Sequence, residues 1–394
     1  MTPAVAVSRR GAERIRARHP WIFRSDIAQA TADAGDLVQV TTDRGRPLGW
    51  AYWSTTSQIA LRMLSFSTAA FWRDSGWFET RIRRAAAYRE SLGIDASVWR
   101  LVHGESDGLP ATIVDRYGDV DGSVYFVVQT LTQGSDRRLP ALVAALDALF
   151  QPRGIVARND PKVRALEGLP EQVEVIHGEV PDRITVTEGR VRLRVDLRRG
   201  QKTGLFLDQR ENHAVAAAVA RGRALDAFTY NGGFALQMAG SATHVLALDA
   251  SEPAVSLTRE NAEANGLTNV EARTCNVFDE LRELEIAGAR FDTIVLDPPA
   301  FAKNKAAVAK AVGGYKEINL RAMRLLEPGG RLISCSCSYN VDESMFMGVL
   351  QAAAADAGVS MMVEERRMQA RDHPVLVTVP ETAYLKCVVL RKAE

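Results

Sequence analysis

Two cysteines in the last quarter of the chain are the residues best suited to covalent chemistry. Residues 334–338 read SCSCS and close a predicted strand. Because residues i and i+2 of a strand face the same side, Cys335 and Cys337 should point the same way. At roughly 3.3 Å per residue, Cys335 lies ~6.6 Å deeper than Cys337, which suits inert packing. Cys337, nearer the carboxyl end of the strand, is the candidate nucleophile. A buried unreactive thiol, the commoner role of a free cysteine, stays open as the alternative.

The reaction that such a thiolate could perform is methylation of a pyrimidine at carbon 5. That carbon is too weakly nucleophilic to take a methyl group directly. A thiolate that adds to carbon 6 turns the ring into an enamine, and carbon 5 can then attack the methyl group of a sulfonium. Loss of the carbon-5 proton expels the thiol. The mechanism needs a cysteine within reach of both base and cofactor, and Cys337 matches that requirement.

Polar residues and glycines follow the predicted parallel strands, at the edge where open α/β sheets bind their ligands. The first strand runs into Gly232 and Gly233, whose backbone can approach a ligand closely. The second ends in Asp249, which could accept the hydroxyl hydrogens of a ribose. The third ends near Asn276, which could accept from the adenine amine. The turn lacks the GxGxxG pattern that holds a pyrophosphate, so the set favours S-adenosylmethionine over a nicotinamide dinucleotide.

The fourth strand ends in the loop 297–301, which reads DPPAF. Prolines remove backbone donors and fix φ, which leaves carbonyl groups free to accept from an exocyclic amine of a base. Asp297 could hold the edge of that base or receive a proton. The alternative is a rigid loop that merely ends a buried strand.

Residues 185–394 alternate between strands and helices at 20- to 30-residue intervals, which predicts a parallel sheet with covering helices. Pro328–Gly330 is expected to separate a helix from a strand. The predicted strands are Ala224–Phe228, His244–Asp249, Val270–Thr274, Phe291–Asp297, Gly330–Ser338 and Leu385–Leu390. The predicted helices are Ala235–Met238, Glu252–Asn265, Tyr315–Leu326 and Ser344–Ala357.

The first 70 residues predict a small β-rich module, and residues 71–184 predict a second, α+β block. The module opens with six arginines against one acid, and Trp21 and Phe23 lie among them. Arginines can neutralise phosphates and aromatic rings can stack on bases, so the segment could bind nucleic acid. A solvated charged helix beside two core aromatics explains it equally well. Predicted strands of the two blocks are Leu37–Thr41, Leu48–Trp53, Ile59–Leu64, Ala111–Asp115, Val124–Thr130, Arg153–Arg158 and Val173–His177, with helices at Phe78–Leu92 and Leu139–Phe150.

The composition is that of an ordinary globular protein. The chain has 394 residues, of which 46% are hydrophobic and 25% charged, with a formal net charge of +1. These values exclude wholesale disorder, and they confine any partner preference to local patches of charge. No apolar run approaches the ~18 residues of a membrane helix, and the N-terminus lacks the pattern of a secretory signal. Four cysteines exclude a disulfide scaffold and suit a reducing cytoplasm, where we expect the protein to act.

Several further stretches make the sequence familiar. Residues 101–119 (LVHGESDGLPATIVDRYGD) and 200–210 (GQKTGLFLDQR) are followed in order by NGGF, DPPAF, GYKEINLRAM and SCSCS, and then by DHP and PET near the C-terminus. Taken together, the sequence resembles the bacterial 23S ribosomal RNA cytosine-C5 methyltransferases that carry an N-terminal PUA domain. The likeness covers nearly the whole chain.

The resemblance implies three domains: a PUA-like RNA-binding barrel at 1–70, a central α+β domain at 71–184 and a Rossmann-like class I methyltransferase at 185–394. It implies S-adenosyl-L-methionine as cofactor, 23S ribosomal RNA (naked or in an assembling subunit) as partner, no membrane and no metal. The expected catalytic residues are Cys337 and Asp297. The residues expected to hold the cofactor are Lys202, Thr203, Gly204, Phe228, Tyr230, Asn231, Gly232, Gly233, Asp249, Ala250, Ser251, Asn276, Val277 and Asp297. The residues expected to contact RNA are Pro298, Pro299, Phe301, Arg9, Arg10 and Arg14.

Three rival hypotheses remain. An exocyclic-amine methyltransferase would use the DPPAF loop and need no nucleophilic cysteine. A non-catalytic RNA-binding assembly factor would keep the domain as a scaffold, and a nicotinamide oxidoreductase lacks its phosphate turn. Under the C5 hypothesis, the group that removes the carbon-5 proton is unassigned, because the DPPAF loop has no second cysteine; Asp297, Cys335 or a water could do so. A monomer and a homodimer are both compatible with the sequence.

Overall fold

The structure is a computed structural model, and it describes residues 3–69, 76–302 and 304–393. The chain divides into two compact units. Unit 1 comprises Met1–Thr187, Val195–Leu207 and Arg371–Thr382, and unit 2 comprises Glu188–Arg194, Asp208–Ala370 and Ala383–Glu394. Two short segments that the sequence assigned to the C-terminal domain, 195–207 and 371–382, therefore group with unit 1. The predicted boundary at 70/71 lies outside the described residues, and the three-domain division stays a prediction.

Unit 1 begins with a six-stranded sheet in the order β2-β6-β5-β4-β1-β3, and the β-rich module predicted for this region is confirmed. One helix, α1, packs its apolar residues Ala12 and Ile15 into the core of this sheet. Ser8 starts the helix, because its Oγ accepts from the Gly11 N–H at 3.2 Å. The three strands predicted for the first 70 residues correspond to β4, β5 and β6 of this sheet. The bounds are β1 (Ala4–Val7), α1 (Arg9–Arg16), β2 (Trp21–Phe23), β3 (Ile27–Thr31), β4 (Leu37–Thr42), β5 (Pro47–Trp53) and β6 (Ile59–Ser65).

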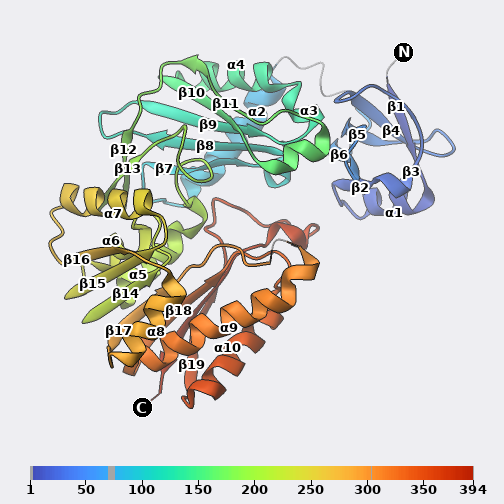
Figure 1. Ribbon diagram of the computed structural model, residues 1–394. Helices are drawn as coiled ribbons and strands as arrows, with labels where there is room; N and C mark the ends of the chain where they lie inside the picture. The colour runs from blue at the N-terminus through green and yellow to red at the C-terminus, as the bar shows by residue number, and fades with distance from the viewer. Residues whose placement is uncertain (1–2, 70–75, 303, 394) are drawn as a thin grey trace. The chain divides into compact units, whose positions relative to one another are not determined.

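Unit 1 continues with a five-stranded sheet in the order β11-β10-β9-β8-β7, against which α2 and α4 pack (Figure 1). Strand β7 was not predicted, because it follows helix α2 without an alternating pattern. The bounds are α2 (Trp77–Ser91), β7 (Val98–His103), β8 (Thr112–Gly118), β9 (Val124–Thr130), α3 (Gln133–Asp136), α4 (Leu139–Phe150), β10 (Gly154–Asn159) and β11 (Gln172–Gly178). A further two-stranded sheet consists of β12 (Ile184–Glu188) and β13 (Val191–Val195).

Unit 2 is built on a seven-stranded sheet in the order β16-β15-β14-β17-β18-β20-β19. The first five of these strands are parallel, whereas β20 and β19 are antiparallel to their neighbours, so the wholly parallel sheet predicted from the alternation is wrong at this edge. The bounds are β14 (Arg223–Ala227), β15 (His244–Asp249), β16 (Val270–Thr274), β17 (Phe291–Leu296), β18 (Leu326–Ser336), β19 (Met361–Arg367) and β20 (Lys386–Lys392).

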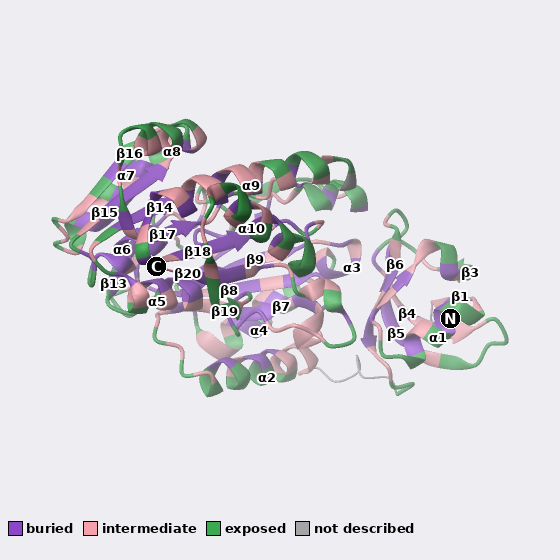
Figure 2. Cartoon of the chain, turned by 90° about the horizontal axis from the view of Figure 1, so that it is seen from below, coloured by how far each residue is buried: buried purple, intermediate pink, exposed green. Residues whose placement is uncertain are grey.

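Helices cover both faces of this sheet. Helices α8, α9 and α10 pack on one face through Leu225, Leu332 and their neighbours. On the other face, α5, α6 and α7 pack on Ala224, Ile333 and Cys335. The bounds are α5 (Arg210–Val219), α6 (Gly233–Met238), α7 (Glu252–Ala264), α8 (Val277–Ile286), α9 (Val308–Leu325) and α10 (Glu343–Ala357). Because both faces are covered, the central strands are buried along their length, as the purple strands of Figure 2 show.

Residues 328–330 do not separate helix from strand as predicted. They lie within β18, whose pairing with β17 shifts between Phe291 and Thr293. Asn265 and Gly266 do end α7, with Gly266 at φ 66°. In the described parts of the chain, no helix has the length and apolar character needed to cross a membrane.

Candidate active site

The sheet of unit 2 reverses its strand order at β14, which pairs with β15 on one side and with β17 on the other. A reversal of this kind opens a crevice at the carboxyl ends of the two central strands, which is where open α/β sheets bind ligands. The segments 228–233 and 297–301 follow β14 and β17 respectively. The predicted site residues of unit 2 therefore gather at this edge.

The turn after β14 has an unusual backbone. Phe228 and Tyr230 both adopt positive φ, at 71° and 50°, a region that non-glycine residues rarely occupy. Hydrogen bonds hold the turn: Phe228 N–H donates to the carbonyl of Leu248 at 2.8 Å, and Tyr230 N–H donates to Asp249 Oδ2 at 2.9 Å. Strain at such a turn persists only where the surroundings impose it, which is typical of binding sites.

Gly232 and Gly233 pack closely against neighbouring helices. Gly232 lies at φ 89°, immediately before α6. A Cβ added to Gly233 would lie 2.7 Å from the imidazole carbon Cε1 of His213, on α5. The sequence attributed both glycines to ligand approach. The structure gives Gly233 a second reason, the packing of α5 against the turn.

Asp249 organises the turn through both of its carboxylate oxygens. Oδ2 accepts from Tyr230 N–H, and Oδ1 accepts from Ser251 N–H at 2.9 Å. Ser251 then caps α7, since its Oγ accepts from the Ala254 N–H. Each carboxylate oxygen has a second lone pair, so Asp249 retains acceptor capacity for the two hydroxyl groups of a ribose.

Asp226, at the end of β14, is a polar residue of this site that the sequence analysis missed. Its carboxyl is fully buried and accepts from Thr229 Oγ at 2.5 Å and from Ala235 N–H at 2.9 Å, both at Oδ2. Burial, reinforced by the charge of Asp297, raises the pKa of Asp226 to about 7. An acid within the otherwise apolar run 224–228 (ALDAF) was the available signal.

Two buried polar atoms beside the turn have no hydrogen-bond partner within the described chain: Asp226 Oδ1 and Asn231 Nδ2. Buried polar groups in native proteins are almost always satisfied, so such atoms indicate a ligand or ordered water. One acceptor and one donor suit the amino and carboxylate groups of an amino-acid moiety, and they therefore fit the methionine part of S-adenosylmethionine.

A buried histidine completes this side of the sheet. His213 Nδ1 lies 2.6 Å from Glu188 Oε1, and its ring contacts that of Phe234 edge to face. Burial by itself lowers the pKa of His213, but Glu188, with smaller contributions from Asp297 and Asp226, raises the pKa above its ordinary value. The ion pair holds the ring in place under Gly233.

Asn276 lies at the start of α8. It is exposed and caps α8, because its Oδ1 accepts from the Phe278 N–H at 3.0 Å. Its oxygen is thus already used for the helix, and the expected contact to adenine stays a prediction. Nearby, the rings of Phe228, Phe278 and Phe301 lie 5.8 to 6.4 Å apart by centroid. These three rings form an aromatic wall beside the turn after β14.

Asp297 is held by a residue that the sequence analysis missed. Gln209 Nε2 donates to Asp297 Oδ1 at 2.8 Å, and Asn212 Nδ2 donates in turn to Gln209 Oε1 at 2.7 Å. Gln209 was visible only as part of the GQKTGLFLDQR stretch. The chain thus orients Asp297 through a pair of amide side chains.

Cys337 follows the end of β18 and faces the loop 297–301. Its sulfur lies 3.9 Å from the carbonyl oxygen of Pro298. Ser338 joins the two loops, since its Oγ accepts from the Ala302 N–H at 3.2 Å and lies 2.8 Å from the hydroxyl of Tyr315. Cys337 is half-buried, whereas Cys335 is fully buried among apolar side chains. The predicted contrast between the two thiols is confirmed.

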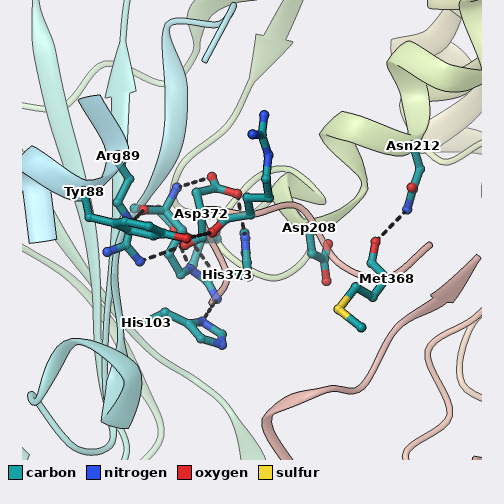
Figure 3. A network of polar contacts seen from close by, with 12 residues as sticks. Tyr88, Arg89, His103, Asp208, Asn212, Met368, Asp372 and His373 are labelled. Carbon is teal, nitrogen blue, oxygen red and sulfur yellow. Dashed lines mark hydrogen bonds and ion pairs between the residues drawn. The ribbon is translucent and has the colours of Figure 1, made fainter. Parts of the chain in front are cut away.

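In unit 1, two of the motifs of the resemblance meet in a buried polar network (Figure 3). Arg89 makes a bidentate pair with Asp107 and donates to the carbonyl of Asp372 at 2.8 Å. Asp372 Oδ2 accepts from the Arg100 N–H at 2.9 Å, and the rings of His103 and His373 lie 5.2 Å apart. The segment 371–382 is therefore fixed to its unit by Arg89 and Arg100, and the LVHGESDGLP stretch adds the His103 ring contact and a hydrogen bond from Ser106 Oγ to the Pro374 carbonyl at 2.7 Å.

The loop 200–204 is also held from within unit 1. Thr203 Oγ donates to Asp115 Oδ2 at 2.6 Å, and Lys202 places its ammonium over the ring of Phe206 at 4.2 Å. Arg158 donates to the carbonyl of Gly200 at 2.9 Å. These contacts fix the loop, and the cofactor contacts expected of Lys202, Thr203 and Gly204 stay a prediction.

Arg9, Arg10 and Arg14 have partners within the N-terminal module itself. Arg9 pairs with Glu13 at 2.9 Å, and Arg10 pairs with the buried Asp26 at 2.5 Å. The guanidinium of Arg14 lies 4.7 Å from the centre of the Phe23 ring. The charged helix offered as the alternative is present as α1, and contact between these arginines and RNA stays a prediction.

Comparison with known proteins agrees with this architecture. Residues 5–66 match the model of a PUA-like domain, and residues 133–391 match that of an S-adenosylmethionine-dependent methyltransferase. A protein of Tolumonas auensis named ribosomal RNA large subunit methyltransferase I is 41% identical over 384 residues, with 95% of both chains covered. A Vibrio cholerae protein of the same name is 38% identical over 406 residues, covering 99% of this chain and 100% of the relative.

Solved structures show the same fold at much lower identity. A candidate SAM-dependent methyltransferase from Streptococcus mutans has a TM-score of 0.82 at 19% identity, and it covers 99% of this chain and 100% of its own. A candidate methyltransferase complexed with SAH has a TM-score of 0.84 at 20% identity with the same coverage. With two thirds of its length in the matched domain and relatives of equal length at about 40% identity, the chain belongs to the S-adenosylmethionine-dependent methyltransferases that carry an N-terminal PUA-like domain.

Proposed function

We propose that this protein methylates carbon 5 of a cytosine in 23S ribosomal RNA, with S-adenosylmethionine as methyl donor and Cys337 as covalent nucleophile. The shared name of its full-length relatives supports ribosomal RNA of the large subunit as the substrate class. The single observation that carries the C5 chemistry is the position of Cys337, half-buried after β18 and 3.9 Å from the Pro298 carbonyl. An inert core thiol would be buried like Cys335.

The cofactor, when bound, supplies an electrophilic methyl group. Asp249 has acceptor capacity for its ribose, and the aromatic wall 228/278/301 suits its adenine. Asp226 Oδ1 and Asn231 Nδ2 suit its amino-acid end. These residues bind and orient, and the apolar wall also excludes water from the reacting centre.

The chain's own residues carry the rest of the reaction. The Cys337 thiolate forms a bond to carbon 6 of the cytosine, and the electron pair of the 5,6 double bond becomes available at carbon 5. After carbon 5 has gained the methyl group, a base removes its proton, and the carbon–sulfur bond breaks to return the thiolate. Asp297, which Gln209 orients, is a candidate for that base. The cytosine must be unstacked to reach Cys337, so single-stranded or locally opened RNA is the expected substrate.

A second candidate reaction keeps the fold and methylates an exocyclic amine. The observation that favours it is the DPPAF loop itself, because the Pro298 carbonyl could accept from such an amine. This reaction needs no nucleophile, so it predicts that Cys337→Ala keeps most of its activity.

Trapping with a fluorinated substrate separates the two reactions. The protein is incubated with S-adenosylmethionine and 23S RNA that contains 5-fluorocytidine, and the products are run on a denaturing gel. The fluorine cannot leave as a cation, so a C5 reaction stops at the covalent adduct. We expect an adduct in the wild type and in Cys275→Ala, a control that removes another half-buried thiol, and none in Cys337→Ala. Methyl transfer to ordinary RNA without an adduct in the wild type would favour the exocyclic-amine reaction.

A further inference from the structure

The strand beside Cys337 contributes a lysine. Strands β18 and β20 are antiparallel, with Cys335 opposite Cys387 and Ser336 opposite Lys386. Lys386 therefore lies level with the last residue of β18, directly before Cys337. It begins β20, so it occupies the same edge of the sheet as the Cys337 loop.

The ammonium of Lys386 is fixed at that edge by two carbonyl groups. Its Nζ donates to the carbonyl of Ser338 at 2.8 Å and to that of Tyr384 at 3.0 Å. A lysine ammonium has three N–H donors, and the described residues take two of them. The charge is thus anchored to the residue that follows Cys337, with one donor left for a sulfur or a water.

The charges near this lysine support an interaction with Cys337. Burial lowers the pKa of Lys386, while Cys337 and then Asp342 act on the lysine in the opposite direction. Because a pairwise electrostatic interaction is reciprocal, the ammonium that a thiolate stabilises must stabilise that thiolate equally. Tyr315, from α9, also faces Cys337, but burial raises the pKa of that phenol, so it stays neutral at physiological pH.

The contact of Cys337 with the Pro298 carbonyl does not favour a thiolate. A thiol that donates to the Pro298 carbonyl is stabilised in its protonated form, whereas covalent catalysis requires the thiolate. A nearby cation opposes that preference. Asp297 acts on the buried Cys335 from the loop after β17, and a carboxylate would disfavour a thiolate.

We propose that Lys386 is a positioning residue for the nucleophile: anchored on the Ser338 and Tyr384 carbonyls, its ammonium favours the reactive thiolate of Cys337. The inference rests on the nucleophilic role of Cys337 under the proposed function. It adds a residue whose part in the reaction is electrostatic and which does not contact the base.

The chain offers a matched control at the other end of the same strand. Lys392 also donates from Nζ to two carbonyls, those of Met323 at 3.1 Å and Leu326 at 2.7 Å, and burial lowers its pKa as well. Lys392 is the last residue of β20 and Lys386 is the first. If such a lysine only stabilised the local structure, replacing it by glutamine should change the alkylation of Cys337 equally at both positions.

The test is the pH dependence of Cys337 alkylation in the protein without RNA or cofactor. Iodoacetamide reacts with thiolates, and peptide mass spectrometry follows Cys337 separately from Cys275, whose pKa burial raises to about 11. In Lys386→Gln the side chain can still donate to the carbonyls but carries no charge. We expect its Cys337 rate at pH 7 to fall roughly tenfold and to recover at higher pH, as it would for a change of one pH unit in the midpoint. Lys386→Arg should restore most of the rate, and Lys392→Gln should match the wild type.

An unchanged midpoint in a folded Lys386→Gln, or an equal shift in Lys392→Gln, would overturn the inference. If Lys386→Gln does not fold, Lys386→Arg decides: a wild-type pH profile supports an electrostatic role, and loss of Cys337 reactivity at every pH contradicts it. The assay involves no methyl transfer, so it is independent of the trapping experiment. Absence of a covalent adduct in the wild type would therefore contradict the C5 reaction alone. An unchanged alkylation profile in Lys386→Gln would contradict the role of Lys386 alone.

Discussion

Replacing Asp226 by asparagine should make the protein more stable at alkaline pH. The carboxyl is fully buried at the end of β14, and its Oδ1 has no hydrogen-bond partner within the described chain. Asparagine has nearly the same shape. The oxygen of asparagine can accept from Thr229 and Ala235 as the carboxylate does. Because the amide is neutral, the substitution also removes a charge from the buried site.

The magnitude follows from the raised pKa. In the unfolded chain the carboxyl ionises near its ordinary value of 3.8, whereas in the folded chain its pKa is raised to about 7 by burial and by Asp297. Between these values the unfolded state releases a proton that the folded state keeps, so stability falls as the pH rises through this window. At ~1.4 kcal/mol per pH unit, the full penalty is about 4 kcal/mol above pH 7 and about 2 kcal/mol at pH 5. The advantage of Asp226→Asn should therefore grow by about 2–3 kcal/mol from pH 5 to pH 8.5.

Guanidinium unfolding of the wild type and Asp226→Asn at pH 5 and 8.5 measures this difference. Asp356→Asn, which changes an exposed carboxyl on α10, is the control and should be nearly neutral at both pH values. The reasoning is refuted if the advantage of Asp226→Asn is the same at both pH values, or if the variant is less stable than the wild type at pH 8.5.

Two further perturbations test the packing of each unit. Gly233→Ala should destabilise unit 2 by ~1–3 kcal/mol, because the new methyl group would lie 2.7 Å from a His213 ring that cannot move freely. Gly348→Ala, on α10 with open space around it, should be neutral or slightly stabilising. A calorimetric melting temperature of Gly233→Ala equal to or above that of Gly348→Ala would contradict the argument. Asp107→Asn should destabilise unit 1 by ~3 kcal/mol in guanidinium unfolding, since it leaves the buried guanidinium of Arg89 without its carboxylate. A loss of stability below ~1 kcal/mol would contradict a stabilising role of this ion pair.

The order of most strands and helices in unit 2 could be predicted, but α5, α8 and β19 were not, and the edge of the sheet that carries the candidate site followed from the strands that were. Strands β15 and β16 have the predicted bounds: β15 is a short apolar run that ends in Asp249, whereas β16 alternates apolar and polar residues. The contrast in burial between Cys335 and Cys337 followed from the rise per residue of a strand, which places Cys335 deeper. Inferences of this kind depend on residues that are close in sequence, where the geometry of a strand is fixed.

The errors arose where the position of a residue depends on a distant segment. The antiparallel direction of β20 has no local signature, so its pairing with β18 was not predicted, and with it the place of Lys386. Asn276 was expected at the end of a strand, yet an Asn before the acidic run of α8 is equally a helix cap. The strand ends at Thr274 as predicted, and the side-chain oxygen of Asn276, two residues later, serves the helix that follows.

The acidic residues of the site show why conformation and binding are hard to separate from sequence. Asp249 was predicted to bind a ribose, but its two oxygens also hold Tyr230 and Ser251 in place. Removing that carboxylate would therefore release the positive-φ turn as well as a ligand contact. A variant such as Asp249→Asn keeps one acceptor oxygen but places an amide N–H₂ against a backbone N–H, so weakened cofactor binding alone could not identify a ribose contact. Comparing its affinities for S-adenosylhomocysteine and for the 2′,3′-dideoxy analogue separates the two roles: a ribose contact requires the wild type, but not the variant, to prefer the hydroxylated ligand strongly.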